Sequence, residues 1–176
     1  AKTKEEFRKS VEEKAWDTLF IRKPVHTNEF VYTPAGTVHG IEGKLMMAEV
    51  QQSSDVTYRI YDYDRKDANG NMRELHIDQA IEVTNIPHIE PDVHPIVTML
   101  EGNEVIEYVN EKYFSVTRYK IQNEIQINNP SYSLCLPFRG NGILDIDGKD
   151  YDIQAGIGFI ITSHTKRYSI QGLSLI

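Results

Sequence analysis

The N-terminal residues carry apolar side chains at the spacing of a helix. Phe7 and Val11 are four residues apart, and lysine and glutamate fill most of the positions around them, which is typical of an amphipathic helix. Thr3 followed by Glu6 fits a capping box, in which the threonine hydroxyl accepts a backbone N–H of the first turn. We therefore predict a helix over 3–15 with a solvated charged face.

After this helix the chain changes to short apolar runs separated by turn residues, a pattern typical of strands. Asp147-Gly148, flanked by alternating side chains, predicts a two-residue hairpin. A second helix is predicted over 74–83. The strands predicted in the first half of the chain are 18–23, 29–33, 45–52 and 56–63. The strands predicted in the second half are 103–109, 113–121, 124–128, 132–138, 142–153 as a hairpin, 157–162 and 166–175.

Three prolines separate these two groups of strands. Pro87, Pro91 and Pro95 interrupt any regular helix, because proline lacks the backbone N–H and clashes with the preceding turn. We interpret 85–98 as an ordered crossing between two lobes.

Composition narrows the function classes. The chain of 176 residues has a formal net charge of -7 and no basic run, which disfavours nucleic acid and anionic membranes as partners. No apolar stretch approaches the roughly 20 residues of a membrane span. The single Cys135 cannot form an internal disulfide, and its apolar neighbours indicate a buried thiol in a reducing, cytoplasmic compartment. A catalytic thiol is the weaker interpretation.

The segment from Asn28 to His39 predicts a rigid corner that presents one histidine. Asn28 tolerates the positive φ of a turn, and a short strand of alternating side chains follows it. Pro34 removes a backbone donor, and Gly36 allows a sharp bend. His39 is thereby expected at a strand edge, where a metal ligand can be held in place.

This spacing resembles the second histidine motif of the cupin barrels, with Asn28 where that family usually has glycine. The longer run from Glu49 to Arg65, which contains Ser54-Asp-Val-Thr-Tyr-Arg59, resembles type I mannose-6-phosphate isomerase in the short form common in bacteria. The resemblance continues through 73–82. It implies a mainly β fold, a cupin-like double-stranded β-helix or jelly roll, with two lobes and a short helical insertion.

The same resemblance implies the domain organisation. Residues 1–84 are expected to hold the helical insertion and the second half of the catalytic barrel, followed by the crossing at 85–98. Residues 99–176 are expected to form a C-terminal cupin-like jelly roll with a structural role, because Arg167 stands there where the overlaid first lobe has His39. The family has roughly another half of its catalytic barrel upstream, so we expect this chain to lack the upstream metal-ligand segment.

The activity that the resemblance implies is zinc-dependent aldose–ketose isomerisation between mannose 6-phosphate and fructose 6-phosphate, through a cis-enediolate. Arg59 matches the family's catalytic arginine, and a guanidinium can stabilise the negative charge of that intermediate. The structural alternative is an arginine paired with Asp62 or Glu49. His39 is the expected zinc ligand, and its structural alternative is a histidine satisfied by hydrogen bonds at a barrel mouth.

Further site residues are less specific. Glu49 is a candidate proton shuttle, or a carboxylate that orients His39 or balances Arg59. Lys44 is a candidate phosphate contact, although a solvated turn lysine is the favoured interpretation. The candidates for contacts to sugar hydroxyls are Gln51, Asp55 and Thr57.

The zinc site is incomplete in this sequence. A catalytic zinc takes about three protein ligands, and the family's Gln-x-His pair and glutamate are expected upstream of this chain. One alternative is therefore a non-catalytic truncated cupin that binds sugar phosphate or a partner, with an upstream segment or a second copy as possible partners. Another is an iron-dependent dioxygenase, which needs two histidines close together, whereas His39 has no partner histidine near it in the sequence.

Overall fold

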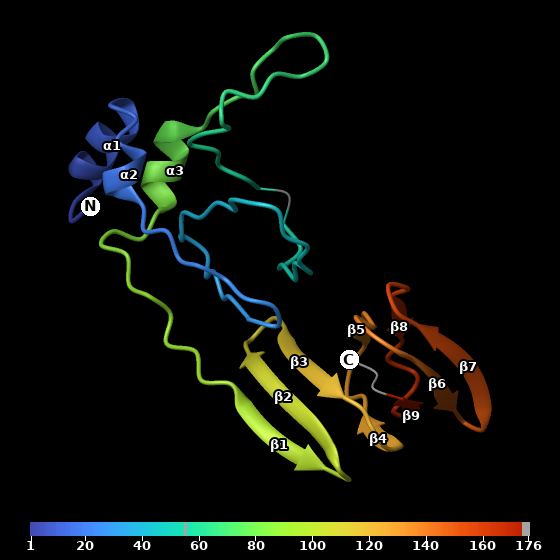
Figure 1. Cartoon of the computed structure of the whole chain (residues 1–176). Coiled ribbons are helices and arrows are strands. Elements are labelled where there is room, and N and C mark those ends of the chain that lie inside the picture. Colours follow the sequence, from blue (N-terminus) through green and yellow to red (C-terminus); the bar gives the residue numbers. More distant parts are fainter. Residues whose placement is uncertain (55, 174–176) are drawn as a thin grey trace. The chain divides into compact units, whose positions relative to one another are not determined.

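The computed structural model describes residues 1–54 and 56–173. The chain forms two compact units, 1–92 and 93–176. Within the described residues the three helices belong to the first unit and the nine strands to the second (Figure 1). The boundary between the units falls inside the crossing predicted at 85–98.

The first unit is built on a small helical core. Helix α1 spans Lys4–Glu12, α2 spans Trp16–Leu19 and α3 spans Ile77–Val83, and α1 contacts both of the others. The predicted cap is confirmed, because the Thr3 hydroxyl accepts from the Glu6 backbone N–H at 3.1 Å. The buried side chains at the centre of this core are Phe7, Val11 and Ile81.

Residues 20–76 differ from the prediction. Among the described residues of this stretch, the only β-bridge is the isolated one between Lys66 and Met72. The strands predicted at 18–23, 29–33, 45–52 and 56–63 are therefore absent from the described chain. An extended segment becomes a strand only when a ladder of hydrogen bonds joins it to a neighbouring backbone, and the described sheets contain none of these four segments. The alternation at 30–33 persists without the strand, since Phe30 and Tyr32 are half-buried and Val31 and Thr33 are exposed.

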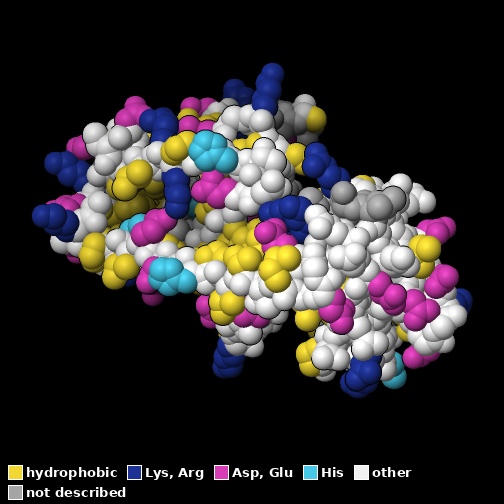
Figure 2. Space-filling view, turned by 60° about the horizontal axis from the view of Figure 1, so that its bottom comes forward, with side chains coloured by type: hydrophobic (Ala, Val, Ile, Leu, Met, Phe, Trp, Pro, Cys, Tyr) yellow, Lys and Arg dark blue, Asp and Glu magenta, His cyan; other side chains and the backbone are white. Residues whose placement is uncertain are grey.

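The same stretch leaves large apolar side chains in solvent. Met46 is 99% exposed, and Figure 2 shows hydrophobic side chains at the surface in several patches between charged groups. Contiguous exposed apolar surface is uncommon on a protein that has buried its own core. The exposed large hydrophobic residues of this stretch are Ile21, Val25, Val31, Ile41, Leu45, Met46, Met47, Val50, Val56, Tyr58, Tyr63, Met72 and Leu75.

The second unit is an antiparallel β structure. Its strands are β1 (Ile96–Leu100), β2 (Asn103–Asn110), β3 (Ser115–Lys120), β4 (Ile125–Asn128), β5 (Ser133–Cys135), β6 (Asn141–Ile146), β7 (Lys149–Gln154), β8 (Phe159–Ile161) and β9 (Arg167–Leu173). They form three sheets, in the orders β1-β2-β3, β4-β9-β6-β7 and β5-β8. The fold of the chain is thus mainly β. The predicted strands from residue 103 onward are confirmed in number and order, whereas β1 begins inside the predicted crossing.

The core of the second unit follows from period-2 alternation. In β4, Ile125 and Ile127 are buried and the residues between and after them are exposed. The hairpin between β6 and β7 is confirmed, with Asp147 and Gly148 at φ of 54° and 79°, as a tight primed turn requires. The other buried members of this core are Ile121, Leu144, Ile153, Ile161, Tyr168 and Ile170. No helix among the described residues has the length and apolar character to cross a bilayer.

Candidate functional site

The corner before His39 forms as the sequence predicts, although no strand leads into it. The Thr37 N–H donates to Pro34 O at 3.0 Å, and Gly36 adopts φ of 86°, which fits a turn with its third residue in the left-handed region. Asn85 fixes the corner from outside, because its side-chain amide donates to Ala35 O at 3.0 Å and its backbone N–H donates to Gly36 O at 2.9 Å.

His39 is exposed, and its tautomer follows from one contact. Nδ1 lies 3.0 Å from the carbonyl oxygen of Thr37. A carbonyl oxygen only accepts, so Nδ1 carries a hydrogen, and the neutral imidazole then has its lone pair on Nε2. This is the arrangement in which an imidazole presents Nε2 to a metal ion.

His39 and Arg59 are anchored to the same helical core through their neighbours in the chain. Val38 and Ile60 both pack against the cluster centred on Phe7. Val38 directly precedes His39 and Ile60 directly follows Arg59, so each candidate residue is next to a side chain that is fixed by apolar packing. No described contact joins His39 and Arg59 directly.

A second link between the two segments comes from glycine. A Cβ at Gly40 would lie 3.1 Å from the Tyr63 hydroxyl oxygen, so the residue after His39 lies against the segment that follows Arg59. A side chain at Gly40 would push this tyrosine away, so the absence of a Cβ there permits the approach.

Arg59 is held on several sides and its side chain is only 20% exposed. Its terminal nitrogen donates to Glu74 O at 3.3 Å, and Nε lies 3.9 Å from Asp62 Oδ1. Its backbone pairs with His76, which donates its N–H to Arg59 O at 2.7 Å. The Arg59–Asp62 ion pair that was the structural alternative exists. Its distance of 3.9 Å is longer than the 3.3 Å hydrogen bond to Glu74 O, so the guanidinium is held mainly by the Glu74 carbonyl.

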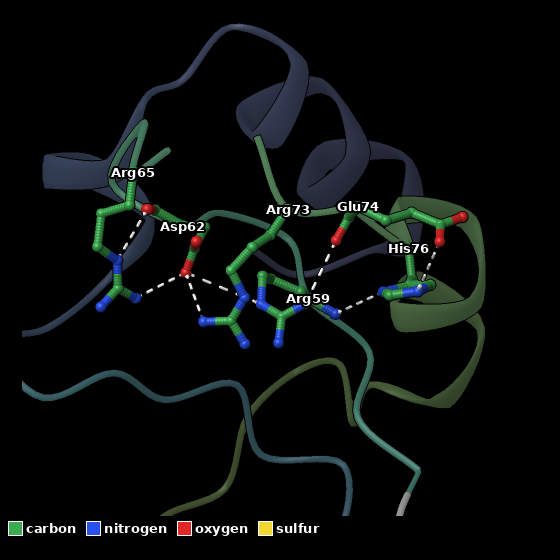
Figure 3. Close-up of polar contacts among 6 residues, drawn as sticks. All are labelled: Arg59, Asp62, Arg65, Arg73, Glu74 and His76. Atoms are coloured by element: carbon green, nitrogen blue, oxygen red, sulfur yellow. Dashed lines mark hydrogen bonds and ion pairs between the residues drawn. The ribbon is translucent and has the colours of Figure 1, made fainter. Parts of the chain in front are cut away.

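Asp62 joins three arginines, as Figure 3 shows. The same oxygen, Oδ1, lies 2.6 Å from Arg65, 3.5 Å from Arg73 and 3.9 Å from Arg59. The Asp62 side chain is 7% exposed, and its other oxygen, Oδ2, is buried with no hydrogen-bond partner among the described residues. A buried carboxylate is costly unless it is paired, so its charge is balanced through Oδ1.

A tight turn places Arg65 on Asp62. The Arg65 N–H donates to Asp62 O at 3.1 Å, and the two residues between them, Tyr63 and Asp64, have φ of 55° and 52°. Two consecutive non-glycine residues in the left-handed region are uncommon and cost free energy, so the surroundings must hold them there. Arg65 supplies part of that support, because its Nε also donates to Asp62 O at 3.2 Å.

The remaining predicted site residues are not drawn into this cluster. Glu49, Gln51, Thr57 and Lys44 are exposed, and no described contact joins any of them to His39 or Arg59. Asp55 lies outside the described residues. The sequence indicated Asp62 only as the partner of Arg59 in the structural alternative, and no local pattern pointed to Arg65 and Arg73.

A metal-binding cluster is also not formed within the described residues. No group of three or more histidine, cysteine, aspartate or glutamate side chains there is arranged to hold an ion. His39 suits a zinc ligand, but the described residues do not make up a complete zinc site.

Comparison with known proteins identifies the fold. Residues 104–176 match the family described as "Mannose-6-phosphate isomerase, cupin domain". The crystal structure of the mannose 6-phosphate isomerase from Bacillus subtilis matches 99% of this chain and 56% of that chain, with a TM-score of 0.87 and 28% identity. The chain is therefore a cupin-type β protein.

The curated relatives that match this chain are named mannose-6-phosphate isomerases. The chain is 39% identical over 175 residues to "Probable mannose-6-phosphate isomerase GmuF" of Bacillus subtilis strain 168. It is 35% identical over 173 residues to the mannose-6-phosphate isomerase of Streptococcus mutans serotype c. Each alignment covers 98% of this chain, and the chain spans about half the length of these relatives, 55% and 54%. Along nearly its whole length, the chain is therefore similar to part of these mannose-6-phosphate isomerases.

Proposed function

We propose that this chain carries the arginine-bearing part of an isomerase that interconverts mannose 6-phosphate and fructose 6-phosphate. The observation that carries the proposal is the similarity to named mannose-6-phosphate isomerases along 98% of the chain. The fixed position of Arg59 supports it, because a preorganised guanidinium is what an anionic intermediate requires.

In this reaction a proton leaves C2 of the aldose and is delivered to C1. The C1 carbonyl becomes a hydroxyl and the C2 hydroxyl becomes a carbonyl, so atoms and electrons balance without an external oxidant. Between the two steps a cis-enediolate carries negative charge on oxygen. Arg59 is proposed to donate to that oxygen, since the Glu74 carbonyl and Asp62 hold its guanidinium and little reorganisation is needed as the charge develops.

Zinc is proposed as the cofactor, with His39 as its ligand from this chain through Nε2. Bound zinc supplies a Lewis acid for an oxygen of the sugar. Since the described residues do not make up a complete site, the remaining ligands are proposed to come from a polypeptide segment upstream of those residues or from another chain.

The other site residues keep their proposed roles. The Glu49 carboxylate is exposed, and it is proposed to take and return the proton. Gln51, Thr57 and Asp55 are proposed to contact sugar hydroxyls. Lys44 is a weaker proposal for a phosphate contact, because it lies in an exposed turn.

The test is metal content and isomerase turnover of the 176-residue chain. If a second copy of the chain supplies the remaining ligands, we expect about one zinc per chain in the wild type, loss of zinc in His39→Ala, and retention in His164→Ala, which alters an exposed histidine of the other unit. A zinc-free wild-type chain would instead assign those ligands to an upstream segment. Arg59→Lys is expected to retain zinc and to lower kcat by roughly 10²–10³-fold. A wild-type chain that binds zinc but shows no turnover would refute the proposed activity for this chain.

One observation favours a second function, that of a non-catalytic module that binds a partner. The described residues lack a metal-binding cluster, and the stretch 20–56 exposes many apolar side chains. The partner would be an upstream segment or a second copy that covers this surface. Sedimentation velocity distinguishes the cases, since a monomer that turns over substrate excludes a need for a second copy.

A further inference from the structure

Four of the six residues drawn in Figure 3 form a group with unbalanced charge. Arg65, Asp62, Arg73 and Arg59 lie in a row, and three guanidinium groups contact one carboxylate oxygen. Arginine remains protonated at any ordinary pH, so the row has a formal charge of about +2. No other described acidic side chain forms an ion pair with these arginines.

Arg65 and Arg73 have donors to spare. Arg65 uses Nε on Asp62 O and one terminal nitrogen on Asp62 Oδ1, and Arg73 uses one terminal nitrogen on Oδ1. A guanidinium has five N–H donors, so each retains several without a described acceptor. The two side chains are 62% and 53% exposed, in contrast to the largely covered Arg59, so a solute can reach them.

The local fold holds these two arginines in place. Arg65 ends the tight turn that starts at Asp62, and its guanidinium lies 5.6 Å from the centre of the Tyr63 ring. Arg73 follows directly after the bridge between Lys66 and Met72, which closes the intervening loop and returns the chain to Asp62. The two guanidiniums contact the same oxygen, so they are fixed close together before any ligand arrives, which lowers the cost of binding.

We propose that Arg65 and Arg73 bind the phosphate group of a phosphate monoester, with Asp62 as the residue that positions them. A phosphate monoester carries about -1.5 to -2 charges at pH 7, which matches the row, and its oxygens accept the paired N–H donors of guanidinium groups. This inference deepens the proposed function, on which it rests for identifying the ester as a sugar phosphate. Arg59, next to Arg73 in the row, then faces the sugar.

The first test is calorimetric titration of the 176-residue chain with mannose 6-phosphate, mannose and inorganic phosphate. We expect binding of mannose 6-phosphate and of phosphate, and none of mannose at the same concentration. Arg65→Gln and Arg73→Gln are each expected to weaken phosphate binding by tenfold or more. Arg139→Gln removes the same charge from an exposed site of the other unit and is expected to leave the affinity unchanged.

Asp62→Asn tests positioning against simple charge. Removing this carboxylate makes the row more positive, so attraction by net charge alone predicts tighter phosphate binding. Positioning predicts weaker binding, because the guanidiniums lose the oxygen that holds them together. Fluorescence of Trp16, whose ring is 4.9 Å from that of Tyr61, monitors whether the variant keeps its local fold. Arg65→Gln and Arg73→Gln change exposed side chains, so they still test the phosphate site if Asp62→Asn unfolds.

The outcomes separate this inference from the proposed function. Unchanged phosphate affinity in both Arg65→Gln and Arg73→Gln would overturn the phosphate site, even if the chain turns over substrate. Phosphate binding that depends on both arginines, in a chain without turnover, would support the site and refute the proposed activity. Tighter phosphate binding by folded Asp62→Asn would overturn the positioning role.

Discussion

Gly36 allows the corner before His39 to be tested by adding a single methyl group. Its φ is 86°, and a Cβ there would lie 2.6 Å from Asn85 Nδ2 and 2.9 Å from Val83 O. The first contact is to a side chain that can rotate away. The second is to backbone at the end of α3, which cannot move without disturbing the helical core. Gly36→Ala therefore adds both a conformational penalty and a steric one.

The magnitude can be worked from these contacts. Placing a residue with a Cβ in the left-handed region costs roughly 1–2 kcal/mol. Rotation of the Asn85 amide breaks its 3.0 Å hydrogen bond to Ala35 O, which is worth about 1 kcal/mol. Displacement of the Val83 carbonyl adds strain of about 1 kcal/mol. We expect Gly36→Ala to lower the free energy of unfolding of the first unit by roughly 3–4 kcal/mol in total.

The assay is urea unfolding followed by fluorescence of Trp16, the single tryptophan of the chain, which stacks on Tyr61 in the same unit. Gly43→Ala is the matched control, because Gly43 has φ of 97° and a Cβ there would meet nothing within 4 Å. The control is expected to cost only the conformational term, roughly 1–2 kcal/mol. If the two variants differ by less than about 0.5 kcal/mol, the steric reasoning about Asn85 and Val83 is wrong.

Three further predictions concern other parts of the chain. Ile125→Ala, at a fully buried position, should lower the free energy of unfolding of the second unit by about 2–5 kcal/mol. Urea melts followed by far-UV circular dichroism measure this change. Ile160→Ala, at an exposed position, should change the free energy of unfolding far less, and equal effects would contradict the assigned core. Burial raises the pKa of the Cys135 thiol. The rate at which iodoacetamide alkylates this thiol should therefore increase with pH around a midpoint above the ordinary pKa of a thiol. A midpoint at or below that ordinary pKa would contradict the burial argument. Hydrogen bonds from the backbone N–H groups of Asn71 and Asn69 hold the pKa of Asp67 below its ordinary value. Because the pKa is lowered, the stabilisation of the loop is present above the unfolded-state pKa and is lost as the pH falls through the folded-state pKa. The amide chemical shifts of Asn69 and Asn71 should therefore titrate with a midpoint below 3.8, and a midpoint at 3.8 or higher would count against these hydrogen bonds.

Local sequence signals predicted the features that depend on local chemistry. The Thr3 cap, the Asp147-Gly148 hairpin and the corner at Gly36 each need only a few adjacent residues, and all three are present. The strands of the second unit were predictable because alternating side chains and nearby partner strands favour the same structure.

Features that depend on distant partners were predicted less well. The alternation at 29–33 favours a strand, but a strand also needs a partner strand, and this segment is in none of the sheets that the structure describes. The arginines that surround Asp62 were equally hidden. Arg73 reaches Asp62 only after the chain has closed the loop between Lys66 and Met72, and no spacing rule relates two residues eleven positions apart through an irregular loop.

The two parts of the candidate site thus have different structural origins, and this difference bears on how the site works. The corner that presents His39 is local, and Asn85 attaches it to the end of α3. The row of arginines depends on a turn with two residues in the left-handed region, a strained arrangement that the bonds between Arg65 and Asp62 help to hold. Both parts attach to one helical core, through Val38 and Ile60. Loss of that core would therefore release the histidine and the arginines together, so the core can keep their spacing constant while the loops between them vary.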